Sequence, residues 1–251
     1  MKSINKNVVY CLCCYEDKKV ENLFVEKVIN RYIKLLKESD IKTDFKIINF
    51  IPDEINDRLN TIQNFHKNTN NSNKTYYRRL INPKRAHHIK AWNTKFYLIN
   101  QFFNSSYESM LYLDCDLHIR KIFSLNSRDE LCFRIKPRLT KLRTYHPISV
   151  ARAHLSDSTI TKHIQAGSFY INKNYSFNLE EILNLNEIQK LWEKDSNFLR
   201  EEAVFTYLFN KHNLIDKITD PPMKFRHIDT WENKLKYFRG VFYAKTKRIP
   251  L

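Results

Sequence analysis

Two aspartates one residue apart, Asp114 and Asp116, come directly after a run of apolar residues. That run predicts a buried strand over Ser109–Leu113, and along a strand residues i and i+2 point to the same side. Both carboxylates can then face one cation while Cys115 packs behind them. Carboxylate oxygens without soft donors favour Mg²⁺ or Mn²⁺ over zinc. We therefore take the pair as a candidate divalent-cation site; a helix cap or turn that uses two aspartates is the alternative.

The composition limits what such a site would serve. The chain has 251 residues, and 43 Lys and Arg against 27 Asp and Glu give a formal net charge of +16. A positive field attracts nucleic acid, an acidic membrane surface or a nucleotide diphosphate, although solvated lysines encoded by an AT-rich genome would give the same charge. The two glycines, Gly167 and Gly240, are too few and too far apart for a dinucleotide fingerprint or a P-loop.

Hydrophobic periodicity predicts an α/β fold around the aspartates. Val8–Cys14 is a continuous apolar run typical of a buried parallel strand. Apolar residues at helical spacing follow over Glu21–Glu38, and a second strand is predicted over Phe45–Ile51. Strand, helix and strand at this spacing form a βαβ unit with a parallel sheet.

The rest of the chain continues the pattern without a repeat or a linker, so we predict one domain over residues 1–251. Further helices are expected over Arg85–Phe103, Leu179–Lys194 and Phe198–His212, further strands over Leu131–Ile135 and Gln165–Asn172, and a polar loop over His66–Lys74. The basic stretch Lys136–Arg152 shows no clear period.

The cysteines and the apolar run near the N-terminus indicate where in the cell the protein would be found. Cys11, Cys13 and Cys14 fall within the first predicted strand, with neither metal-finger spacing nor a disulfide-like distribution. Buried thiols of this kind suit a reducing compartment. The apolar run near the N-terminus, about eight residues, is too short to span a membrane. We expect a cytoplasmic protein, with peripheral membrane contact through basic residues as an open alternative.

Three segments resemble motifs of GT-A-fold glycosyltransferases, in the order those enzymes have them. YLDCDLHI is similar to their Asp-x-Asp segment, and HIQAGSFYIN resembles their Asn-Ala-Gly strand, with Gln165 where Asn is common. FLREEAVFTYLFNKHN is similar to the helix that opens with an Asp-Glu or Asp-Gln pair in retaining members, with Glu201 and Glu202 at those positions. The match is closest in kind to the glycogenin-type and blood-group-type families.

This resemblance implies a GT-A-like single domain with a mostly parallel, Rossmann-like central sheet flanked by helices. Residues 1–116 would be the nucleotide-sugar-binding half and residues 117–251 the acceptor-side half. The implied reaction moves a sugar from a nucleotide-sugar donor, with UDP favoured, to a glycan or protein acceptor. It would depend on Mn²⁺ or Mg²⁺, with retention of anomeric configuration somewhat favoured.

The chemistry assigns roles to individual residues. A cation on Asp114 and Asp116 would neutralise charge on the leaving diphosphate, which lysines such as Lys90 and Lys95 could assist. Positive charge on the anomeric carbon requires a carboxylate beneath the sugar ring. Glu202 is the first candidate, as nucleophile or as electrostatic stabiliser, and Glu201 could bind sugar hydroxyls. The alternative for this pair is an ordinary first helical turn, where Glu favours the macrodipole.

The remaining candidates surround the donor. Tyr15 would stack on the base or offer a backbone group to uracil, and Gln165, Ala166 and Gly167 would let the sugar approach the backbone. His227 is the candidate third metal ligand, although the family's His-x-x-Gly ending is not present. A satisfied or exposed histidine is the alternative there.

Two other classes compete. Phosphatases resembling haloacid dehalogenases also carry Asp-x-Asp after a strand, but on the first strand and with Thr or Val where His118 stands here. A nucleic-acid-binding or metal-dependent nucleic-acid-processing protein is favoured by the net charge and by aromatic residues among the basic residues of Phe225–Arg248. No nucleic-acid motif supports it. Alternatively, this tail and Lys136–Arg152 would hold an anionic acceptor.

Overall fold

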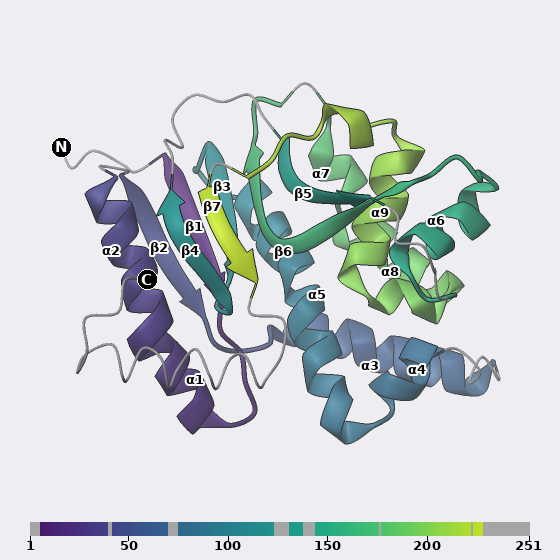
Figure 1. Ribbon diagram of the computed structural model, residues 1–251. Helices are drawn as coiled ribbons and strands as arrows, with labels where there is room; N and C mark the ends of the chain where they lie inside the picture. The colour runs from purple at the N-terminus through teal and green to yellow at the C-terminus, as the bar shows by residue number, and fades with distance from the viewer. Residues whose placement is uncertain are drawn as a thin grey trace.

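The computed structural model describes residues 6–39, 42–69, 75–122, 131–137, 144–175, 177–221 and 223–227. Its centre is a five-stranded sheet in the order β2-β1-β3-β6-β5 (Figure 1). The strands are β1 (Asn7–Leu12), β2 (Thr43–Ile48), β3 (Ser109–Asp114), β5 (Leu131–Pro137) and β6 (Lys162–Asn172).

Four of these strands run in one direction. β1 pairs in parallel with β2 and β3, whereas β6 is antiparallel to both β3 and β5. The predicted α/β class with a mostly parallel central sheet flanked by helices is confirmed. Each strand predicted from its apolar run is present. The runs of β1 and β3 are buried on both faces of the sheet, whereas β2, at the edge of the sheet, is only partly buried.

One face of the sheet is covered by the helix predicted over Glu21–Glu38. It consists of α1 (Lys18–Phe24), a π-helical turn and α2 (Asn30–Glu38), and it begins where the Asp17 carboxylate accepts from the Lys19 backbone N–H at 2.9 Å. Its buried side chains, such as Tyr32, pack against β1 and β3 and against a small sheet of β4 (Leu117–Ile122) and β7 (Met223–His227).

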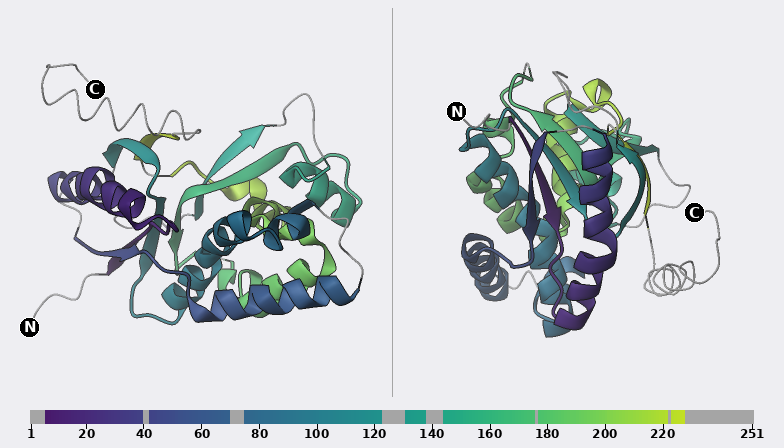
Figure 2. Two further views of the ribbon diagram at one scale, coloured as in Figure 1. Left: turned by 90° about the horizontal axis from the view of Figure 1, so that it is seen from below. Right: turned by 90° about the vertical axis from the view of Figure 1, so that its left-hand side faces the viewer.

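The other face carries the larger part of the core, and Figure 2 shows the two faces covered by different helices. The helices there are α3 (Asp53–Asn68), α4 (Thr75–Leu80), α5 (Pro83–Phe103), α6 (Pro147–Leu155), α7 (Leu179–Ile182), α8 (Leu185–Lys194) and α9 (Glu201–Lys211). None of the helices in the described ranges combines the length and the apolar character needed to cross a membrane.

Three of these helices, α3, α4 and α6, were not predicted. α3 begins directly after Pro52 and carries Asp53 and Glu54 in its first turn. It extends to Asn68, so the first part of the predicted loop His66–Lys74 is helical; residues 70–74 lie outside the described ranges. His66 is buried, and its Nε2 lies 2.7 Å from the carbonyl of Trp192, so a tertiary contact fixes this end of the helix.

α6 lies in the stretch that shows no period in the sequence. The His146 side chain caps it by accepting from the Ile148 N–H at 3.3 Å, and Ser156 ends it in a left-handed conformation with φ of 54°.

The predicted boundaries near the C-terminal half also differ from those observed. The predicted helix Leu179–Lys194 is divided into α7 and α8, because the Asn184 side chain accepts from the Glu187 N–H at 2.9 Å and starts a new helix. The predicted helix Phe198–His212 begins at Glu201, after a 3₁₀ turn over Ser196–Leu199.

Candidate functional site

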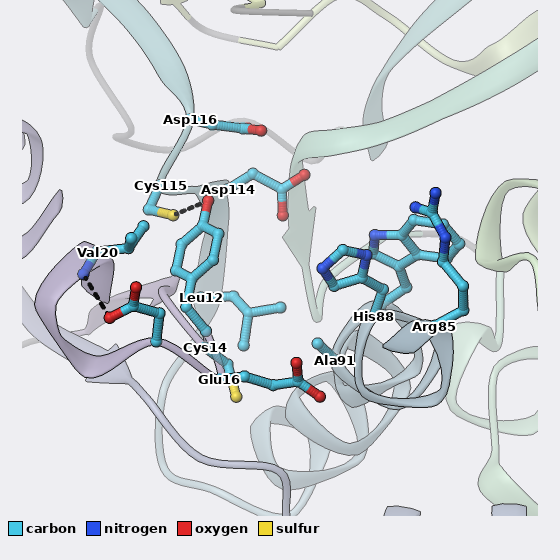
Figure 3. Close-up of a pocket in the computed structure, with 13 residues that line it drawn as sticks. Leu12, Cys14, Glu16, Val20, Arg85, His88, Ala91, Asp114, Cys115 and Asp116 are labelled. Atoms are coloured by element: carbon cyan, nitrogen blue, oxygen red, sulfur yellow. Dashed lines mark hydrogen bonds between the residues drawn. The ribbon is translucent and has the colours of Figure 1, made fainter. Parts of the chain in front are cut away.

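A cavity of about 660 Å³ lies where β1 and β3 end. These strands are parallel and in register, with Leu12 beside Asp114, so the segments that follow both strands meet at one edge of the sheet. Tyr15 lines this cavity together with Asp114 and Asp116. Figure 3 shows the two aspartates at the end of β3. Three of the residues singled out from the sequence are therefore brought together.

Helix α5 supplies the opposite side of the cavity. The α5 wall consists of Arg85, His88, Ala91 and Trp92. Arg85, His88 and Trp92 follow one another at helical spacing and so share one face of α5. Sequence reasoning missed this wall, although the spacing within the predicted helix Arg85–Phe103 was a signal for it.

The Asp114 carboxylate has defined partners. The Tyr112 hydroxyl donates to its Oδ1 at 2.6 Å, and the Lys95 ammonium lies 3.5 Å from its Oδ2. Burial raises the pKa of Asp114 to about 7, the Lys95 charge opposes this rise, and the Asp116 and Glu201 carboxylates add to it. Asp114 is therefore a carboxyl group that a cation would hold in its charged form.

Lys95 does not face the cavity. Its side chain is only 1% exposed, and its ammonium donates to Glu201 Oε1 at 3.0 Å while lying 5.3 Å from the centre of the Tyr112 ring. Burial alone would lower the pKa of Lys95, but Asp114 and Glu201 more than offset this, so its pKa is raised. The expected contact of Lys95 with a diphosphate is not supported by this position, because Lys95 links the aspartate segment to α9.

Lys90 lies on another face of α5. Its ammonium donates to Asn56 Oδ1 at 2.6 Å and to Asn60 Oδ1 at 2.8 Å, both on α3. It is not among the residues that line the cavity. The predicted contact of Lys90 with a donor diphosphate is therefore not supported by its position, because its ammonium bridges two helices instead.

Glu201 and Glu202 open α9, as their resemblance to the family helix implied. Glu201 is buried against Lys95, whereas Glu202 pairs with the Arg200 guanidinium. Burial raises the pKa of Glu202; Arg200 opposes this rise and Glu201 adds to it. Through Lys95, α9 is connected to the cavity edge at Asp114, although neither glutamate lines the cavity.

Tyr15 is held by three contacts. Its ring stacks on Phe24 with centroids 5.0 Å apart, and its hydroxyl lies 3.6 Å from the Cys115 thiol. Its backbone N–H donates to Glu21 Oε2 at 3.1 Å, and the Glu21 side chain is buried. Of the two roles expected for Tyr15, stacking on a base remains available, whereas its N–H is already used.

The turn that carries Asp116 is held by hydrogen bonds from Tyr32 of α2. The buried Tyr32 hydroxyl donates to the carbonyl of Leu117 at 2.5 Å and accepts from the Leu117 N–H at 3.1 Å. It also lies 3.3 Å from the carbonyl of Asp114. One side chain thus ties both ends of the Asp-Cys-Asp segment.

The segment Gln165–Gly167 lies in β6 beside the end of β3. Pairing with β5 shifts from Phe133–Phe169 to Arg134–Gln165, which leaves residues 166–168 without partners on β5. Such a bulge re-aims a strand locally. Ala166 is buried, and the Gln165 Oε1 atom is buried with no hydrogen-bond partner in the described part of the chain. None of the three residues lines the cavity.

His227 is described only through its backbone. It is the last residue of β7 and pairs with Leu117, the residue after Asp116. Its side chain lies outside the described part, so the expected third ligand stays a prediction. Within the described ranges no group of three or more His, Cys, Asp and Glu side chains is placed to hold a metal ion. The oxygen donors of Asp114 and Asp116 nevertheless suit Mg²⁺ or Mn²⁺, which commonly takes other ligands from water and phosphate.

A buried histidine on β6 leads to a stability prediction. His163 is 6% exposed; burial lowers its pKa to about 4, and neighbouring His146, Arg200 and Lys136 contribute to the shift. The unfolded chain, with a histidine pKa of about 6.5, then binds more protons than the folded chain as pH falls from about 6.5 to 4. Because of His163, we expect the free energy of unfolding to be about 2 kcal/mol lower at pH 5 than at pH 7.5.

Urea denaturation at both pH values would measure this loss in the wild type and in His163→Gln. The difference between the two proteins isolates His163 from the other titrating groups. An equal loss in both would contradict the prediction.

Comparisons with known proteins give distant similarities. No protein-family model matches the chain, and no curated protein matches it. Among solved structures, mouse xyloside xylosyltransferase 1 in its apo form is 10% identical, with a TM-score of 0.41 over 86% of this chain and 84% of that one. A glycosyltransferase involved in the glycosylation of the major capsid of PBCV-1 is 12% identical, with a TM-score of 0.40 over 94% and 98%.

The apo-form glycosyltransferase GlyE of Streptococcus pneumoniae TIGR4 is 14% identical, with a TM-score of 0.36. The match covers 98% of this chain and 52% of GlyE. At such scores the similarity is too distant to carry an argument, and function has to be argued from the site itself.

Proposed function

We propose that this chain is a glycosyltransferase that moves a sugar from a nucleotide-sugar donor to a glycan or protein acceptor. Asp114 and Asp116 would hold the divalent cation, Mn²⁺ or Mg²⁺. The observation that carries the proposal is the placement of both aspartates in a cavity of about 660 Å³, with Asp114 connected through Lys95 to Glu201. A cavity of this size is in the range of small-molecule sites.

The bound cation would supply positive charge against the leaving diphosphate. The chain's own residues do the rest. Lys95 fixes Asp114 relative to Glu201 through contacts of 3.5 and 3.0 Å, so that the cation site and the sugar site keep a constant separation. The Tyr15 ring, stacked on Phe24, offers a flat surface to the base, for which we favour uracil.

Glu202 is the proposed carboxylate beneath the sugar ring. Its partner Arg200 orients it and partly offsets the burial that raises its pKa. A charged carboxylate stabilises positive charge at the anomeric carbon or attacks it, and attack followed by transfer would retain the anomeric configuration.

Calorimetric titration with UDP and GDP tests the proposal. In the presence of Mn²⁺ we expect UDP to bind, and we expect its affinity to fall at least tenfold with EDTA or in Asp116→Asn, because either change removes the cation from the diphosphate. Asp216→Asn is the matched control, since Asp216 is an exposed aspartate that pairs with Lys162.

The absence of nucleotide binding by the wild type in every condition would contradict the proposal. The net charge of +16 would then favour the nucleic-acid alternative. That alternative predicts binding to an oligonucleotide that falls steeply as salt is raised, whereas cation-mediated binding of UDP depends less on salt.

A further inference from the structure

The two sides of the cavity differ in charge. In the described part of the chain, the wall formed by the segments after β1 and β3, which we call the strand wall, carries four carboxylates, those of Glu16, Asp17, Asp114 and Asp116. The α5 wall carries a guanidinium and an imidazole and lies across the cavity from the aspartates (Figure 3). The cavity is therefore polarised from one wall to the other.

This polarity sets a condition on an anionic ligand. One divalent cation on Asp114 and Asp116 would neutralise two of the four negative charges, so the strand wall would stay negative. An unscreened anion beside two remaining carboxylates is repelled, and the repulsion is stronger where water is excluded. A diphosphate would therefore need positive charge from the other wall.

Arg85 is the residue able to supply it. Among the described residues that line the cavity, it is the permanently charged cation, and it is exposed. No ion pair of Arg85 occurs within the described part of the chain. The two lysines that the sequence suggested are engaged elsewhere, Lys95 with Glu201 and Lys90 with Asn56 and Asn60.

We propose that Arg85 and His88 form the second half of a diphosphate site and hold the donor's phosphate oxygens from the α5 wall, opposite the cation-binding aspartates. The inference rests on the proposed function and deepens it. A guanidinium presents paired N–H donors in a fixed plane that matches two phosphate oxygens. His88 adds an N–H donor one helical turn further along the same face of α5.

A clamp made of a cation on one side and Arg85 on the other has two separable contributions. EDTA removes the first and Arg85→Gln removes the second. Hydrogen bonds to charged groups commonly contribute a factor of about 10 to 100 in affinity. We therefore expect Arg85→Gln to weaken UDP binding by about tenfold or more with Mn²⁺ present, and His88→Gln to weaken it less.

The experiment titrates UDP and uridine into the wild type, Arg85→Gln and Lys90→Gln, each with Mn²⁺ and with EDTA. Uridine affinity should be the same in all three proteins, because uridine carries no phosphate. Lys90→Gln removes the same charge from the same helix and should leave UDP affinity unchanged. Residual UDP binding in EDTA should be weaker at higher salt and should disappear in Arg85→Gln.

The outcomes separate this inference from the proposed function. If the wild type binds no nucleotide, the proposed function itself fails. If the wild type binds UDP and Arg85→Gln binds it equally well, the inference that Arg85 holds the diphosphate is overturned, while the proposed function stands. An equal loss of UDP and uridine affinity also overturns the clamp, since Arg85 would then contact the nucleoside. Arg85→Lys, which keeps the charge without the planar fork, should recover part of the affinity.

Discussion

Replacing Lys95 by Met is expected to lower the free energy of unfolding by about 3–5 kcal/mol, because the buried carboxylates then lose the positive charge of the Lys95 ammonium. The Lys95 side chain is 1% exposed and lies between Glu201 and Asp114. A buried carboxylate without a positive partner still pays the free-energy cost of leaving water, but it no longer gains the attraction to the ammonium that offset this cost. The same change should abolish transfer, since it releases Asp114 from α9.

Urea denaturation followed by circular dichroism measures the effect, with Lys90→Met as the control on the same helix. Lys90 is half-buried and donates to two neutral amides, so its loss should cost about 1 kcal/mol. In the double variant Lys95→Met/Glu201→Gln the loss should be smaller than in Lys95→Met, because one stranded charge is removed. A Lys95→Met protein as stable as Lys90→Met would refute the role given to this ammonium.

Glu202→Gln is expected to reduce the rate of sugar transfer by about 10²–10⁴-fold while UDP and Mn²⁺ bind as in the wild type. The amide keeps the shape of the side chain but removes the negative charge proposed to face the anomeric carbon. Because the charge acts on the transition state more than on the bound donor, the loss should appear in kcat rather than in KM.

Release of UDP from a panel of UDP-sugars, with and without acceptor, gives the rates. Glu187→Gln is the matched control, since Glu187 is an exposed helical glutamate paired with Lys190. Its rates should equal those of the wild type. A Glu202→Gln enzyme within about threefold of the wild type would remove Glu202 from the reaction and leave Glu201 as the remaining candidate of the pair.

The sequence predicted β3, the strand before Asp116, correctly because the signal there is local. A continuous apolar run buried on both faces has few alternatives, and a polar residue at its end falls at the sheet edge, as Asp114 does. The lysines of α5 show where such reasoning stops. Lys90 and Lys95 look alike in the sequence, and only the packing of α3 and α9 against α5 decides that one bridges two asparagines and the other is buried between carboxylates.

The unpredicted helices have a similar cause. α3 and α6 depend on caps and tertiary contacts, such as the His146 side chain that starts α6. The α5 wall was not predicted because Arg85 and Trp92 line a cavity together with the segment after β1, which is distant from them in sequence. The helical spacing indicates that these residues share one face of α5, but a single sequence does not show which distant segment that face meets.

The hydroxyl of Tyr32 binds both backbone groups of Leu117. This contact would affect how tightly the proposed cation binds to the aspartates. A loop that must be ordered on binding loses conformational entropy of about 1–2 kcal/mol per residue, and this loss weakens affinity. The Asp114–Leu117 turn is already held, so its backbone amides should exchange slowly with deuterium before any ligand is added. Tyr32→Phe would loosen the turn without touching a carboxylate, and the ion would then meet a flexible segment instead of a preorganised one.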